Sequence, residues 1–128
     1  VQIYGHGKHV RQFTYIDDAV SAIQCAMTML QNGSLLDKHE IFNVVGESTI
    51  TNDHLVTMLA KEYGVEPRRQ YLDRQPGDVM NCVGSSDKLR RYGWAPLTGI
   101  GDGVRQYARW FESAYREKLF HEWGVIKS

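Results

Sequence analysis

Histidine and cysteine are common metal ligands, and cysteine and serine are common nucleophiles in enzymes. The chain of 128 residues contains five histidines and two cysteines. Their spacing matches no metal-ligand motif, and no serine stands in a Gly-x-Ser-x-Gly turn. The histidines are His6, His9, His39, His54 and His121. The sequence therefore predicts no metal site and no hydrolase nucleophile, and it predicts surface positions for the histidines.

A glycine-rich segment at 99–103 has a composition that could bind a phosphate. Such segments bind dinucleotides when they join a strand to the start of a helix, because free backbone N–H groups then point at the phosphate. Here the segment follows Pro96 rather than a strand, and a third glycine at the required spacing is missing. We therefore expect no cofactor-binding residue in this chain.

The charges of the chain are balanced, with 15 basic and 15 acidic residues. A neutral chain gives no bulk attraction to nucleic acid or to an anionic membrane. The pairs Arg68–Arg69 and Arg90–Arg91 are predicted to lie on a solvated face, with phosphate steering as the alternative. No apolar run approaches the roughly 18 residues of a membrane span. We expect neither a nucleic-acid partner nor a membrane partner.

The two cysteines, Cys25 and Cys82, form no Cys-x-x-Cys pair. Buried free thiols are the favoured interpretation, and a disulfide is the alternative. Free thiols fit a reducing compartment, and no signal peptide opens the chain, so a cytoplasmic location is expected. The chain begins in a strand-like run at Val1 without an initiator methionine, as a fragment of a longer protein would.

The first half of the chain predicts two strands, a helix and a third strand. Residues 1–4 and 10–16 alternate or are rich in β-branched and aromatic types, and glycines between them allow a hairpin. Asp17 or Asp18 would cap a helix that ends near Asn32 and Gly33. The run 41–45 is almost continuously apolar, which is typical of a strand buried on both faces of a parallel sheet.

The second half predicts shorter elements between two helices. A helix capped by Thr51 or Asn52 extends to Gly64, and 69–72 reads as a short strand before a Pro-Gly turn. A short helix follows Ser85 or Ser86, and a last helix covers 104–115. The result is one α/β domain, residues 1–128, with too few strands for a complete doubly wound sheet. Its exposed core would pair with a second copy, as a homodimer, or with a missing half.

Four segments in order resemble a known family pattern. Residues 5–18 resemble GxGxxxRDFxYVxD, and 41–48 are similar to a YNIGxG element. Residues 74–79 resemble a QPGDV loop, and 86–96 resemble SKAxxxLGWxP, with Trp110–Phe111 beyond it. The four patterns that these residues resemble belong to the extended short-chain dehydrogenases/reductases, namely the NAD-dependent nucleotide-sugar epimerases and dehydratases. Each motif alone is weak, but four in this order indicate homology.

The resemblance implies a fold and a ligand class. The chain would be the C-terminal portion of the family fold, with the last Rossmann strands and helices and the small substrate-binding lobe, but without the complete NAD-binding unit. The implied ligand is a nucleoside-diphosphate sugar, and NAD is implied for the complete enzyme. The QPGDV loop tilts the expected chemistry slightly towards 4-epimerisation. A non-catalytic, self-associating module or a relic without ligand is the alternative.

The resemblance also implies the binding residues. In such enzymes the arginine of the RDF segment reaches the diphosphate, which places Arg11 there, and a guanidinium can donate two hydrogen bonds to phosphate oxygens. The aspartate of the loop contacts the nucleotide, so Asp78 is included, and Arg74 and Gln75 are weaker candidates. The alternatives are an ion pair between Arg11 and Asp17 or Asp18, and a plain Pro-Gly turn around Asp78.

Two departures from the family pattern bear on activity. Gln12 stands where the RDF aspartate is expected, and the segment 82–88 lacks the usual Ala-Asp. The family also uses a Tyr-x-x-x-Lys pair on a helix for proton transfer. The one match, Tyr4 and Lys8, encloses two glycines and is interpreted as a coincidence. We therefore predict no catalytic residue in this chain and no activity of the chain alone.

Overall fold

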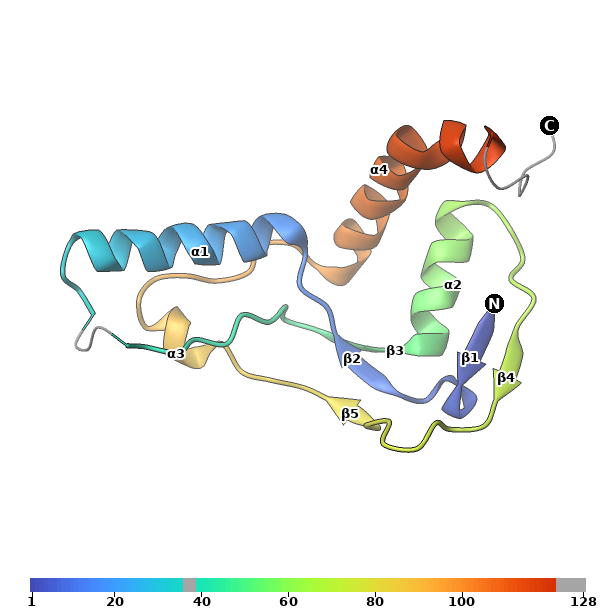
Figure 1. Cartoon of the computed structure of the whole chain (residues 1–128), viewed down its shortest axis with the longest axis horizontal. Coiled ribbons are helices and arrows are strands. Elements are labelled where there is room, and N and C mark those ends of the chain that lie inside the picture. Colours follow the sequence, from blue (N-terminus) through green and yellow to red (C-terminus); the bar gives the residue numbers. More distant parts are fainter. Residues whose placement is uncertain (36–38, 122–128) are drawn as a thin grey trace.

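The computed structural model describes residues 1–35 and 39–121, with side chains described as far as 115. Helices and short strands alternate along the chain (Figure 1). The strands are β1 (Gln2–Tyr4), β2 (Val10–Gln12), β3 (Thr49–Thr51), β4 (Gln70–Leu72) and β5 (Asn81–Cys82). The helices are η1 (Gly5–Gly7, a 3-10 turn), α1 (Ile16–Gln31), α2 (Asn52–Glu62), α3 (Asp87–Arg90) and α4 (Ile100–His121).

The strands form two small sheets rather than the expected hairpin. β1 pairs with β4 in parallel, while β2 lies between β3, which is antiparallel, and β5, which is parallel. The hairpin prediction is wrong because η1 redirects the chain after Tyr4: Gly5, His6 and Gly7 all have positive φ angles. β2 is also shorter than predicted, since the ladder ends at Gln12.

Helix α1 spans the predicted residues, but its start differs. Tyr15 is the N-cap and makes no side-chain cap hydrogen bond, so Asp17 and Asp18 lie in the first turn instead of capping the helix. Asp18 is buried and accepts hydrogen bonds from the backbone N–H groups of Leu97 (2.8 Å) and Thr98 (3.1 Å). The helix thereby anchors the segment that precedes α4.

The apolar run 41–45 is not a strand in the structure, which corrects the prediction. Phe42 and Val44 pack against the core cluster of Ala22, Met29, Leu89 and Trp94. Ile41, by contrast, is 83% exposed. No backbone ladder partner for this run is found among the described residues, so the run is not part of a sheet there.

Helix α2 and strand β4 confirm the predicted pattern, whereas β5 was not predicted. The side chain of Thr51 accepts a hydrogen bond from His54 N and caps α2, and β4 lies within the predicted strand. Helix α4 begins earlier than predicted, at Ile100, and includes two glycines in its first turn. α4 packs against α2 (Figure 1), and the Tyr63 hydroxyl donates to the Ala108 carbonyl at 3.5 Å. Part of the tail, 122–128, lies outside the described residues.

The architecture is a small α/β piece with a partial sheet, as the fold-class prediction requires. In Figure 1, α1 and α3 lie at one end, and α2, α4 and the β1–β4 pair lie at the other. Both cysteines are free, as predicted. Neither is fully buried as predicted, since Cys25 is partly buried and Cys82 is exposed.

Candidate functional site

Arg11 and Asp78 face each other across the gap between β2 and the 74–79 loop. Arg11 Nη2 donates to Asp78 Oδ1 at 3.1 Å, and Arg11 Nη1 donates to the Val79 carbonyl at 2.9 Å. Both side chains are about one quarter exposed, so the pair is reachable from solvent. The structure therefore brings together the two residues that the sequence predicts most strongly, and Arg11 is not paired with Asp17 or Asp18 as in the alternative.

Arg74 and Gln75 belong to the same loop but have different roles. Arg74 donates through Nε and Nη2 to the carbonyl oxygen of Asp78, with the Nε contact at 3.0 Å. The backbone of Asp78 donates to the Gln75 carbonyl at 3.1 Å, which closes the Pro-Gly turn. Both side chains are exposed. The turn is thus real, but Asp78 directs its carboxylate to Arg11 instead of to its own backbone.

His9 is part of this cluster, although the sequence predicted a surface position for it. Its side chain is only 1% exposed, and Nε2 lies 3.3 Å from Asp78 Oδ2. The contact falls outside hydrogen-bond geometry, so neither ring nitrogen has a hydrogen-bond partner among the described residues. The prediction failed because the ring packs over Gly5, whose position next to it depends on the positive φ of η1.

Gln12, the departure from the family pattern, connects two other segments. Its side-chain amide donates to the Gly46 carbonyl at 2.5 Å and accepts from Gly84 N at 2.9 Å. Gly84 lies in the other departing segment, so the two departures touch each other. The sequence could not show this contact, because the residues are far apart in the chain.

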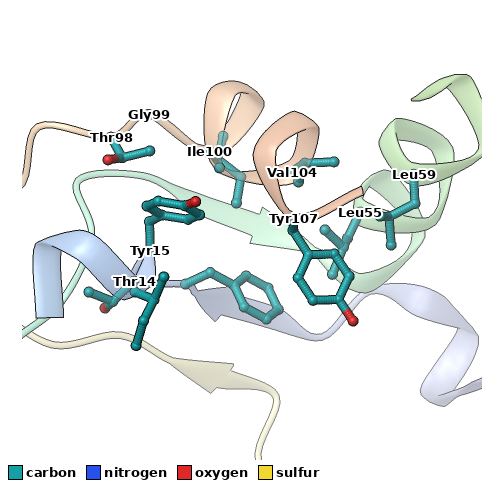
Figure 2. A pocket seen from close by; sticks show the side chains of 12 residues that line it. Thr14, Tyr15, Leu55, Leu59, Thr98, Gly99, Ile100, Val104 and Tyr107 are labelled. Carbon is teal, nitrogen blue, oxygen red and sulfur yellow. The ribbon is translucent and has the colours of Figure 1, made fainter. Parts of the chain in front are cut away.

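A separate cavity of about 390 Å³ lies between the start of α1, α2 and the first turns of α4. Figure 2 shows its lining, to which Tyr15, Leu55, Leu59 and Val104 contribute. The lining is mostly apolar and contains none of Arg11, Arg74, Gln75 and Asp78. A phosphate would find no cation there, so the polar cluster and not this cavity is the candidate site.

Other kinds of site find no support in the described part of the chain. Among residues 1–35 and 39–121, no three histidine, cysteine or acidic side chains are grouped as a metal site would need. Tyr4 ends β1 and Lys8 follows η1, so the Tyr-x-x-x-Lys match is not on a helix. No described helix is both long enough and apolar enough to span a membrane.

Comparison with known proteins gives consistent similarities. No family model matches the chain. The chain is 29% identical to Protein CapI of Staphylococcus aureus over 91% of its length, and 28% identical to a probable UDP-glucuronate 4-epimerase of Rhizobium meliloti, also over 91%. A crystal structure of UDP-glucose 4-epimerase with UDP-glucose from Thermotoga maritima superposes on 93% of the chain, with a TM-score of 0.74 and 26% identity.

The fold belongs to the class of extended short-chain dehydrogenases/reductases. Within that class, the chain is a partial member of the family of nucleotide-sugar epimerases and dehydratases. The homologues of the chain in this family are NAD-dependent enzymes. The chain spans 39% of Protein CapI, 38% of the Rhizobium protein and 35% of the Thermotoga structure. The family prediction is thereby confirmed.

Proposed function

We propose that this chain binds the diphosphate of a nucleoside-diphosphate sugar through Arg11, with Asp78 contacting the nucleotide. The carrying observation is the contact between Arg11 and Asp78, two residues 67 positions apart that come from two family motifs. The relative from Thermotoga maritima was crystallised with UDP-glucose, which supports this ligand class. Arg74 and Gln75 lie on the same loop and would extend the site towards solvent.

The electrostatics of the cluster are compatible with an anion. Arg11 has further N–H groups beyond those directed at Asp78 and at backbone carbonyls, because a guanidinium carries five. Arg74 is exposed, and its guanidinium lies beside the Asp78 backbone. A diphosphate placed over this pair would meet two cations and one carboxylate. Oxidation at the sugar carbon would still require NAD, so the chain would not be catalytically competent alone.

Arg11→Ala tests the proposal. The loss of a charge-assisted contact to a phosphate should weaken binding of UDP-glucose or UDP-glucuronate by about 1.5–3 kcal/mol. Binding is measured by calorimetry or by tryptophan fluorescence. Arg11→Lys keeps the charge but loses the two-pronged guanidinium, so its affinity should lie between those of the wild type and Arg11→Ala. Arg105→Ala is the matched control, since Arg105 pairs with Asp102 on α4.

Thermal unfolding of each variant separates a binding defect from a folding defect. Unchanged affinity of a folded Arg11→Ala protein would show that the diphosphate does not contact Arg11. No response of the wild type to any sugar nucleotide would remove the binding proposal and favour the alternative, a relic without ligand.

A second candidate function, self-association, is favoured by the surface of α1. Ile16, Val20, Ile23, Met27 and Leu30 are spaced by four, three, four and three residues and are between 44% and 63% exposed. A spacing of this kind forms a helix–helix seam. The seam would be covered in a homodimer or by an NAD-binding part of the same family, in the same chain or as a separate protein.

A further inference from the structure

We propose that His9 is the positioning residue of the Arg11–Asp78 site. The imidazole holds the Asp78 carboxylate from the protein interior, so that the other carboxylate oxygen meets Arg11. The carboxylate thereby lies between two basic side chains, with Oδ2 at 3.3 Å from His9 Nε2 and Oδ1 at 3.1 Å from Arg11 Nη2. The effect of His9 on ligand binding rests on the proposed function, whereas the contact between His9 and Asp78 does not depend on it.

Burial is the first argument for this role. His9 is 1% exposed and is one of the two largest fully buried side chains, although it is polar. A buried polar group without a hydrogen-bond partner costs about 1–3 kcal/mol, and apolar residues would fill the same space without that cost. The polar contact recorded for the ring is the approach of Nε2 to Asp78 Oδ2.

The second argument is how the backbone makes room for the ring. A Cβ atom at Gly5 would lie 2.1 Å from His9 Cε1, so only glycine leaves space at that position. Gly5 also has a φ angle of 63°, which side chains rarely adopt. The backbone of His9 is fixed too, because its carbonyl accepts from Asn52 N at 3.1 Å. The ring therefore has a fixed direction.

The third argument concerns the 74–79 loop, whose residues are otherwise mostly exposed. Val10 N donates to the Met80 carbonyl at 2.8 Å, and Arg11 binds the Val79 carbonyl, so the end of the loop is tied to β2. The Asp78 side chain is the part of the loop that reaches the interior. Without His9, Arg11 alone would set the carboxylate direction, and a ligand that competes for Arg11 would release it.

The same contact predicts which nitrogen of the imidazole carries the hydrogen. The contact lies outside hydrogen-bond geometry, but a negatively charged carboxylate oxygen 3.3 Å away favours a hydrogen over a lone pair on Nε2. We therefore expect Nε2 to carry the hydrogen. Long-range proton–nitrogen NMR of the ligand-free protein reports this directly. A protonated Nε2 supports the proposal, and an unprotonated Nε2 overturns it.

Three substitutions separate positioning from packing. His9→Gln keeps an N–H donor near the place of Nε2, His9→Asn reaches only as far as Nδ1, and His9→Leu fills space without a donor. We expect UDP-glucose affinity to fall about tenfold in His9→Leu and His9→Asn and to stay within about threefold of wild type in His9→Gln. Equal losses in all three, or no loss in His9→Leu, would overturn the role.

Hydrogen exchange of the ligand-free proteins completes the test. Exchange of the Val10 and Asp78 amides should be faster in His9→Leu than in His9→Gln, and equal rates would contradict positioning. If the wild type binds no sugar nucleotide, the proposed function fails, while NMR and exchange still decide the contact. If His9→Leu does not fold, His9→Asn and His9→Gln carry the comparison, because both keep a polar side chain.

Discussion

Gln12 illustrates, at the scale of a single residue, how a departure from a family pattern can be structural. The side-chain amide donates at one end to the Gly46 carbonyl and accepts at the other from Gly84 N. An aspartate, as in the family pattern, could accept from Gly84 but could not donate to a carbonyl oxygen. The glutamine thus links β2 to Gly46 and Gly84, which lie just beyond the ends of the β2–β3 and β2–β5 ladders.

Substitution of Gln12 by glutamate should therefore destabilise the fold. The change keeps the size and the acceptor for Gly84 but places a carboxylate oxygen against the Gly46 carbonyl. We expect a loss of about 1–3 kcal/mol in the free energy of unfolding at neutral pH, measured by urea denaturation. Gln24→Glu is the control, because Gln24 is exposed on α1. Equal effects of the two changes would contradict the bridging role.

Tyr71 provides a second prediction at this scale, based on pH. Its hydroxyl donates to Asp53 Oδ1 at 2.8 Å, and this hydrogen bond raises the pKa of Tyr71, with smaller contributions from burial and from the Asp53 charge. A raised pKa in the folded state means that the contact stabilises the fold below the ordinary tyrosine pKa near 10. The contribution is lost as the pH rises through the raised value.

Ultraviolet titration measures this pKa. Since the chain has seven tyrosines, the Tyr71 signal is the difference between wild type and Tyr71→Phe. In an Asp53→Asn background the same difference should titrate at lower pH, closer to the ordinary value. Asp73→Asn, an exposed change near the same strand, should leave it in place. No movement in Asp53→Asn would assign the shift to another cause.

At the scale of elements, the Asp18 carboxylate of α1 holds the backbone segment that leads into α4. Asp18→Ala would leave the partly buried N–H groups of Leu97 and Thr98 without their acceptor, so the free energy of unfolding should fall by about 2–4 kcal/mol. Asp17→Ala is a matched control, because Asp17 lies in the same first turn but is exposed. It should cost less than about 1 kcal/mol, from the helix dipole alone. Thermal or denaturant unfolding of both variants measures the difference.

Local signals predicted the helices well, because caps and stops act within a few residues. Thr51 caps α2, and α1 ends at Gln31 with Asn32 as its C-cap and Gly33 in the left-handed region, as the sequence indicates. Strand pairing depends on distant partners, and there the prediction failed. The β1–β4 pair joins residues 68 positions apart, and β5 was not predicted as a strand.

The candidate site was predictable only in part. The family pattern selects Arg11 and Asp78, and their chemistry explains why they would meet. His9 could not be selected by residue type, because a histidine in a glycine-rich turn usually faces solvent. A signal was present in the adjacent glycines, since Gly5 leaves the space that the ring occupies. Reading that signal requires the φ angles of η1, which the sequence does not provide.

At the scale of the whole molecule, apolar surface is left uncovered on several elements. The α1 seam lies on the opposite side of the helix from Ala22 and Met29, which pack into the core. The run 41–45 covers that core with Phe42 and Val44 and leaves Ile41 in solvent. Both features fit the proposal that this surface is covered by a partner, in a chain that spans 39% and 38% of two of its relatives.

Self-association through the α1 seam can be tested with Ile23→Gln combined with Met27→Gln. Both side chains are more than half exposed, so the fold should keep most of its stability while the seam loses its central apolar contacts. Leu97→Gln is the control, because Leu97 is 92% exposed and lies outside the seam. Light scattering should show a dimer for the wild type and for Leu97→Gln, and a monomer for the double variant. A wild type that stays monomeric at high concentration would contradict the homodimer. The remaining candidate for the seam would then be an NAD-binding part of the family. Adding that part as a separate chain would test whether it covers the seam.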